Sequence, residues 1–232
     1  MVLFLFHQQT PYFSFNICIS THHLFAVCSR ALDIGLIVDV SSKVRGLNFL
    51  RLRNFLKHIV SSFTVSTRAT RFGLVEFSST PRKLFDFNRF TNQATLINVM
   101  GRIPSMKGKA RVGRALKYAA SSLFSRSTRR KVAIVITASK SLDSVTAPAR
   151  LLRRAGVTVV TVGIGRGRSV TQLRQMASTR RYVFASHFKT LSNIVRAIKE
   201  RACKGESHEL FLAVCVLLSP REDNVLLILV LF

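Results

Sequence analysis

The sequence of 232 residues has few acidic residues and no tryptophan. Only 10 Asp and Glu stand against 36 Lys and Arg, so the formal net charge is +26 and the isoelectric point is near 11.6. A balance this one-sided predicts affinity for polyanions such as nucleic acid, sulfated polysaccharide or an anionic membrane surface. A basic surface that merely contacts solvent is the alternative interpretation.

Signatures of common enzymes and metal sites are also missing. The six histidines occur at no HExxH or other metal-ligand spacing, and no G-x-S-x-G nucleophile elbow is present. The run GIGRG at 163–167 lies late in the chain, whereas a dinucleotide-binding GxGxxG motif lies in the first strand–helix turn. We therefore interpret this run as a tight turn, and we predict no catalytic site and no cofactor.

Residues 1–28 contain no Lys, Arg, Asp or Glu, and neither end of the chain contains a long hydrophobic run. The N-terminal segment 1–28 has no positive region before its apolar runs, which HQQ and THH interrupt, so it is at most a poor signal sequence. The C-terminal tail 204–232 has two apolar runs, each far shorter than the ~20 residues of a spanning helix. We predict no membrane span, a strand-like or unfolded tail, and one domain over 29–203.

The middle of the chain alternates between strand-like and helical patterns. Continuous apolar runs such as DIGLIVDV indicate strands that are covered on both faces. Strands are predicted over 33–40, 71–79, 81–87, 131–138, 157–165 and 181–186, and helices over 46–63, 91–103, 112–124, 145–155, 169–177 and 188–202.

This alternation predicts an α/β fold, with a doubly wound, mostly parallel open sheet and helices on both faces. Ligands of such folds bind beyond the carboxyl ends of the strands, where the strand order reverses. The loops predicted at that end are 41–46, 107–112, 138–143 and 163–169.

The stretch DVSSKV at 39–44 is the first of these loops. Asp39 ends a buried strand and is followed by hydroxyl side chains, which is a common way to build a cation site. Lys43, however, occupies a position where a further oxygen ligand would be needed. The residues alone leave open a metal site, a degenerate site or a simple turn.

The order of these motifs resembles that of a von Willebrand factor A domain, over about 28–203. The resemblance rests on DIGLIVDVSSKV, RFGLVEFSS, GKARVGRAL, KVAIVITASKSLDSV and VTVVTVGIGRGRSVTQLRQMAS, followed by YVFASHFKTL. It implies a sheet with one antiparallel edge strand, and a role in adhesion or matrix assembly rather than catalysis. The pattern is most similar to that of matrix proteins such as matrilins and collagen VI chains.

The resemblance also implies a metal-ion-dependent adhesion site in degenerate form. Asp39 and Ser41 match the family's Asp-x-Ser-x-Ser motif, whereas Lys43, Ala110 and Ala138 replace three oxygen ligands. Because Mg²⁺ demands near-ideal octahedral coordination, we expect a vestigial site that binds no metal. Either Lys43 donates to Asp39 in place of the cation, or it points into solvent.

Many basic residues are predicted at the carboxyl end of the sheet, and we call this set the basic crown. Clustered arginines suit sulfate and phosphate, which they bind in a bidentate manner. The basic crown comprises Lys43, Arg45, Lys107, Lys109, Arg111, Lys140, Arg166 and Arg168. A second group is predicted at the opposite end: Arg68, Arg71, Arg126, Arg129, Arg130, Lys131, Arg180 and Arg181.

The four cysteines bear on where the protein is found. In many extracellular members of the family, cysteines placed like Cys28 and Cys203 join the two ends of the domain, so the resemblance implies this disulfide and secretion. Cys18 and Cys215 either pair likewise or stay free. In a reducing compartment all four would be thiols, and the chain contains no N-x-S/T sequon.

These observations favour a non-catalytic, metal-independent binding module in the extracellular space, with matrix proteins or sulfated glycans as partners. One alternative is an intracellular, nucleic-acid-associated protein that uses the same basic surface. Single-stranded nucleic acids are bound by stacking on aromatic rings. Trp is absent, Tyr is rare and most of the 18 Phe fall on core-type positions, which disfavours this alternative. A fragment of a larger multi-domain matrix protein is a further alternative.

Overall fold

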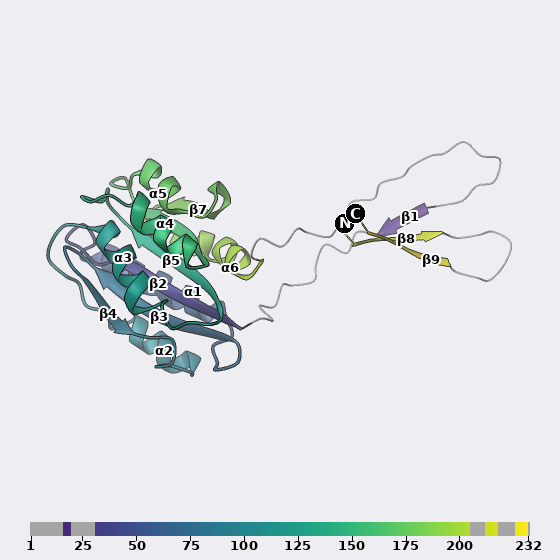
Figure 1. The fold of residues 1–232 in the computed structure, drawn as a ribbon, viewed down its shortest axis with the longest axis horizontal. Helices are drawn as coiled ribbons and strands as arrows, with labels where there is room; N and C mark the ends of the chain where they lie inside the picture. The colour runs from purple at the N-terminus through teal and green to yellow at the C-terminus, as the bar shows by residue number, and fades with distance from the viewer. Residues whose placement is uncertain (1–15, 20–30, 205–211, 218–225, 232) are drawn as a thin grey trace. The chain divides into compact units, whose positions relative to one another are not determined.

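The computed structural model describes residues 16–19, 31–204, 212–217 and 226–231. The chain forms two compact units, 27–205 and 1–26 together with 206–232 (Figure 1). In the second unit, β1 (Asn16–Ile19), β8 (Leu212–Leu217) and β9 (Leu226–Leu231) form an antiparallel sheet in the order β1-β8-β9. Among the described residues, no helix is long and apolar enough to cross a membrane.

The first unit, which we call the main domain, is built on a six-stranded sheet in the order β4-β3-β2-β5-β6-β7. Every neighbouring pair is parallel except β3 and β4, which form an antiparallel hairpin at one edge, as predicted. The strands are β2 (Leu32–Asp39), β3 (Thr70–Phe77), β4 (Pro81–Phe85), β5 (Arg130–Thr137), β6 (Val157–Ile164) and β7 (Val183–Ser186).

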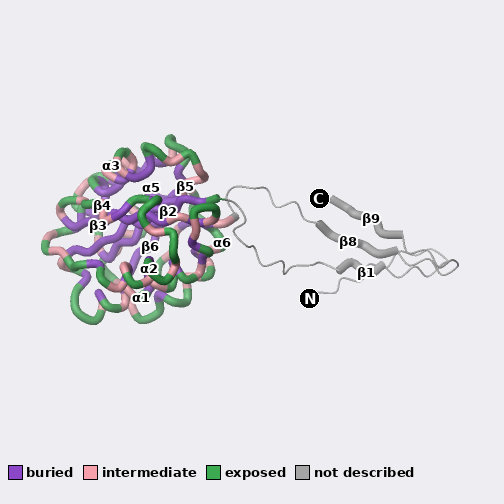
Figure 2. Tube along the Cα trace, turned by 90° about the horizontal axis from the view of Figure 1, so that it is seen from below, coloured by how far each residue is buried: buried purple, intermediate pink, exposed green. Residues whose placement is uncertain are grey.

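Helices cover both faces of this sheet and bury its central strands (Figure 2). One face packs against α1 (Leu47–Ser61), α2 (Gln93–Met100) and α6 (Val195–Lys204). The other packs against α3 (Val112–Ser122), α4 (Thr146–Arg154) and α5 (Val170–Met176). The fold is therefore the predicted doubly wound α/β sheet.

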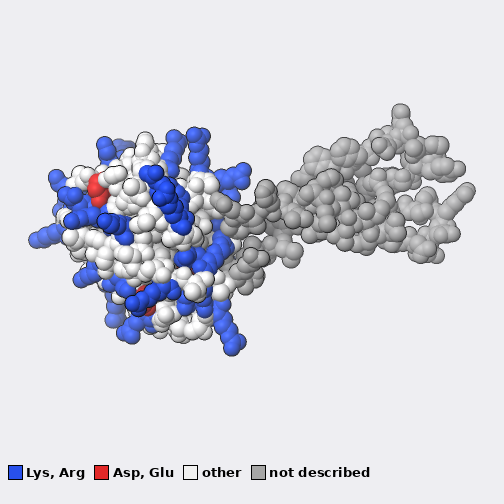
Figure 3. Space-filling model, in the orientation of Figure 1, with Lys and Arg blue, Asp and Glu red and all other residues white. Residues whose placement is uncertain are grey.

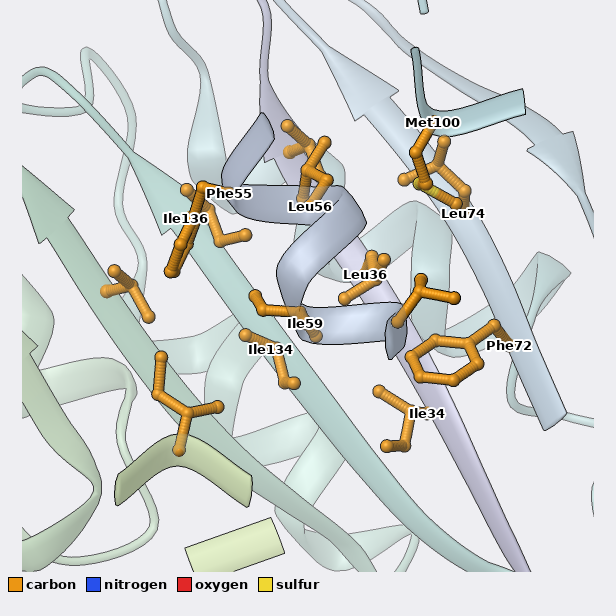
Figure 4. Packing of buried hydrophobic residues seen from close by; sticks show 14 of the residues in the cluster. Ile34, Leu36, Phe55, Leu56, Ile59, Phe72, Leu74, Met100, Ile134 and Ile136 are labelled. Carbon is orange, nitrogen blue, oxygen red and sulfur yellow. The ribbon is translucent and has the colours of Figure 1, made fainter. Parts of the chain in front are cut away.

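The packing of α1 explains why the sequences of the central strands are continuous runs of apolar residues. Phe55, Leu56 and Ile59 of α1 belong to one apolar cluster with Ile34 and Leu36 of β2 (Figure 4), and all five side chains are fully buried. Burying a side chain of this size contributes about 1.5–3 kcal/mol. Because the opposite face of β2 is buried as well, no residue of this strand contacts solvent.

Two predicted elements differ from those observed. The helix predicted over 91–103 spans only Gln93–Met100, because Asn92 caps its start and accepts a hydrogen bond from the Thr95 amide. The helix predicted over 188–202 is a 3-10 helix, η2 (Phe188–Ile194), followed by α6, with non-helical backbone at Thr190. A short 3-10 helix, η1 (Arg180–Tyr182), precedes β7.

Candidate functional site

The four loops predicted at the carboxyl end of the sheet are tied together by hydrogen bonds. The Ser42 amide donates to the Gly108 carbonyl and the Gly108 amide donates to Ser42 Oγ, both at 3.0 Å. The Lys140 amide donates to the Gly167 carbonyl at 2.8 Å, and the Leu142 amide to the Ala110 carbonyl at 3.1 Å. This end of the sheet is therefore assembled by the chain itself.

Asp39 lies beneath these loops and is only 1% exposed. Its Oδ1 accepts a hydrogen bond from the Ser41 amide at 3.0 Å. Its Oδ2 accepts from Thr137 Oγ1 and the Ala138 amide, both at 3.1 Å, and from Ser139 Oγ at 3.3 Å. Four neutral donors thus satisfy the buried carboxylate, which removes the main cost of burying an unpaired charge.

The other positions of the predicted metal site do not fit a divalent cation. Ala110 and Ala138 are buried and offer no side-chain oxygen, which leaves Asp39 and Ser41 as the matching donors. The hydroxyl of Ser41 is buried and makes no hydrogen bond. No group of three or more His, Cys, Asp or Glu within the described residues could hold a metal ion.

Lys43 is exposed and makes no ion pair with Asp39. The ion pairs within the described part of the chain are Arg71–Asp33, Arg82–Glu76 and Arg196–Glu200. Of the two alternatives from the sequence, the structure therefore favours the one in which Lys43 points into solvent.

Asp143 has a structural role at this end that the sequence analysis missed. Its carboxylate accepts hydrogen bonds from the Gly113 and Arg114 amides at 2.9 and 2.8 Å, and from Ser141 Oγ at 2.5 Å. Ser141 Oγ in turn accepts from the Val112 amide at 2.8 Å. Because a negative charge is stabilising at a helix N-terminus, Asp143 caps α3 and fixes the loop that follows β5 to it. One hint was present in the sequence. Arg111 immediately precedes α3 and its side chain does not cap the helix, so the cap had to come from another segment.

The basic crown lies in these loops, and seven of its eight residues are exposed. The exception is Arg168, which is half-buried and donates Nη1 to the Gly165 carbonyl, so its guanidinium is partly committed inside the domain. Two apolar side chains stand among the charges, since Leu47 is 68% and Leu142 57% exposed. The face therefore combines exposed positive charge with two exposed apolar side chains.

Few acidic side chains offset this charge. Of the six Asp and Glu in the described residues, Asp33, Asp39 and Glu76 are fully buried and Asp143 is half-buried. Of these six, only Asp86 and Glu200 are exposed. Lys and Arg consequently dominate the charged surface of the main domain, as the view in Figure 3 shows.

Several basic residues of the opposite end are occupied with internal contacts. Arg71 donates to Asp33 from Nε at 2.8 Å and from Nη2 at 2.6 Å, and these hydrogen bonds raise the pKa of the Arg71 guanidinium. Arg129 donates to the Thr67 carbonyl at 2.5 Å, and Arg130 to the Ala202 carbonyl at 2.7 Å. These three arginines hold the fold together and are less free to bind a partner.

One of the two cysteines of the predicted disulfide lies within the described residues. Cys203 takes part in a disulfide bond, whereas Cys28 lies outside the described residues. The pairing of Cys28 with Cys203 therefore stays a prediction.

The family of the chain follows from comparison with known proteins. The model of the von Willebrand factor type A domain matches residues 33–197, which is most of the chain. The chain belongs to the von Willebrand factor A family. The matched residues coincide with the doubly wound sheet and include Asp39, Ser41 and every residue of the basic crown.

Relatives with this domain are proteins of the extracellular matrix. Matrilin-1 of Gallus gallus is 32% identical over 184 residues, which cover 76% of this chain and 37% of that protein. The collagen alpha-5(VI) chain of Mus musculus is 30% identical over 189 residues, which cover 79% of this chain and 7% of that protein. The chain thus spans about a third or less of these relatives.

A solved structure shows the same fold in another matrix protein. Proximal thread matrix protein 1 of the mussel byssus superposes with a TM-score of 0.72 at 28% identity, covering 81% of this chain and 48% of that protein. One structure of the mussel protein is described as having zinc in its metal-ion-dependent adhesion site. That site thus takes a metal in a relative, whereas the donor set around Asp39 in this chain is incomplete.

Proposed function

We propose that the main domain is a non-catalytic, metal-independent adhesion module of the extracellular matrix, which binds matrix proteins or sulfated glycans through the basic crown. The observation that carries this proposal is the state of Asp39, whose four neutral hydrogen-bond donors take the place of a cation beneath a face crowded with Lys and Arg. The similarity to matrilin-1 and collagen VI supports the extracellular setting.

Metal independence is inferred from the chemistry of the donors. Mg²⁺ gives up its waters reluctantly and binds through carboxylates in octahedral geometry. With alanine at positions 110 and 138, a cation above Asp39 would gain a single carboxylate, with hydroxyls as its other side-chain donors, and would have to break existing hydrogen bonds.

An anionic partner is inferred from the charge of the same face. A bound cation in a metal-dependent adhesion site attracts an acidic group of the ligand; here the basic crown supplies the positive charge directly. Exposed cations in one region raise the local concentration of anions and speed their association. Leu47 and Leu142 add apolar contacts that a protein partner would use.

The experiment compares two variants with the same loss of charge on a heparin column. In the first, Lys43, Lys109, Arg111 and Arg166 of the basic crown are replaced by Ser. In the matched control, four exposed arginines outside the crown are replaced by Ser, namely Arg150, Arg154, Arg180 and Arg181. We expect the first variant to elute at clearly lower salt than the control.

Equal losses from both variants would mean that net charge, and not a site, drives binding. A second column that carries double-stranded DNA separates the nucleic-acid alternative. Both polyanions give steep salt dependence, so the informative result is which of them retains the native chain at higher salt. Stronger retention on DNA would contradict the proposed function.

A further inference from the structure

A second candidate site lies at the end of the sheet where the parallel strands begin, away from the basic crown. A cavity of about 370 Å³ opens between the β3–β4 hairpin, the loop after β4 and the C-terminal end of α3. We call it the polar cleft. Its volume falls in the range of about 300–1,000 Å³ that is typical of small-molecule sites.

Three cations line the polar cleft, and two of them are held in place. Arg71 is fixed by Asp33 and donates Nη1 to Asn88 Oδ1 at 2.6 Å, while Lys83 donates Nζ to the Ser122 carbonyl at 3.1 Å. Arg126 is exposed at the rim. Because Asp33 neutralises Arg71, the remaining positive charge comes from Lys83 and Arg126, and Asp86 in the same lining offsets part of it.

Hydroxyl groups form much of the remaining wall, and their protons are already donated. Ser122 Oγ donates to the Tyr118 carbonyl at 2.7 Å, Ser125 Oγ to the Ser121 carbonyl at 2.6 Å, and Ser127 Oγ to Asp33 at 2.6 Å. Their oxygens are therefore left as acceptors. The exposed carboxylate of Asp86 adds a stronger acceptor to the same cleft.

This mixture of groups selects the class of ligand. A bare anion such as sulfate carries no donor and would be repelled by Asp86 and by the serine lone pairs. A neutral sugar would leave the charges of Lys83 and Arg126 unused. Phe87 and Leu123 contribute an apolar part of the lining, which suits the C–H face of a sugar ring.

We propose that the polar cleft binds an anionic saccharide, a hydroxyl-rich ring that carries a sulfate or carboxylate group. The ring hydroxyls donate to Asp86 and the serine oxygens, and the anionic group pairs with Lys83 and Arg126. This site is separate from the basic crown and goes beyond the proposed function.

The test is calorimetric titration of the full chain with an unsaturated chondroitin sulfate disaccharide, with a neutral disaccharide and with inorganic sulfate. We expect the sulfated disaccharide to bind more tightly than either of the others. Arg126→Ser should weaken this binding about tenfold, the effect of losing one charge-assisted hydrogen bond. The matched control Arg150→Ser removes the same charge from an exposed site on α4 and should leave binding unchanged.

A second variant separates saccharide recognition from simple attraction of anions. Asp86→Asn can keep the hydrogen bond from the Asn88 amide, so the loop is expected to fold. It should weaken binding of the disaccharide, because an amide oxygen is a poorer acceptor, and strengthen binding of inorganic sulfate, because a repulsive charge is removed. Tighter binding of both would overturn the proposal.

The variant in which four residues of the basic crown are replaced by Ser distinguishes binding at the polar cleft from binding at the basic crown. It should bind the disaccharide as the native chain does, even though its retention on heparin falls. If it loses the disaccharide, the short saccharide binds at the basic crown, and the polar cleft is not a site. Absence of any binding of the disaccharide by the native chain would likewise refute the inference.

Discussion

The ion pair between Asp33 and Arg71 gives the sharpest prediction about stability. Asp33 is fully buried and accepts two hydrogen bonds from Arg71 and one from Ser127 Oγ. Arg71→Met would leave this carboxylate in the interior with the serine alone. Removing one partner of a buried pair costs about 3–5 kcal/mol, because the remaining charge is uncompensated.

Urea denaturation measures the free energy of unfolding of the variant and of two controls. Arg196→Met breaks the exposed pair Arg196–Glu200, whose side chains are 76% and 48% exposed, and should cost less than about 1 kcal/mol. The double variant Arg71→Met with Asp33→Leu should recover much of the loss, since it leaves no buried charge. If Arg71→Met costs no more than Arg196→Met, the reasoning is wrong.

Three further predictions concern metal, disulfide and pH. Millimolar Mg²⁺ or Mn²⁺ should leave the thermal midpoint unchanged; a saturable calorimetric signal that Asp39→Ala abolishes would contradict this. Peptide mapping of secreted, non-reduced protein should find Cys28 joined to Cys203, and two free thiols there would refute the pairing. Burial raises the pKa of Glu76 despite its hydrogen bond from Arg82, so the folded state holds this proton more tightly than the unfolded state. Stability should therefore fall as pH rises from the ordinary glutamate pKa through the raised value, and Glu76→Gln should remove this fall when unfolding is measured at several pH values.

The fold was predictable because its central strands are continuous apolar runs, whereas its helices show apolar residues at helical spacing. The apolar runs that became β2, β5 and β6 were located to within two residues at each end. The split at Thr190 was not predictable, because the apolar spacing continues across it while the backbone does not.

The candidate site was predictable only in part. The loss of oxygen ligands could be read directly from Lys43, Ala110 and Ala138. Contacts between distant segments could not: Asp33 and Arg71 are 38 residues apart and meet because parallel register places them side by side. Asp143 reaches the start of α3 from 30 residues away because the fold brings the loop after β5 against that helix. Such pairings depend on strand order and register, which local periodicity does not specify.

The burial of half of the described acidic residues affects how copies of this domain meet each other. With so few exposed carboxylates, two main domains have almost no opposite charges to pair, and they repel at any distance within the Debye length of about 8 Å at physiological salt. Repulsion between like charges would therefore keep copies apart. A polyanion would reverse this, because one chain could gather many copies and neutralise each of them, so the density of modules would follow the density of anions in the surroundings.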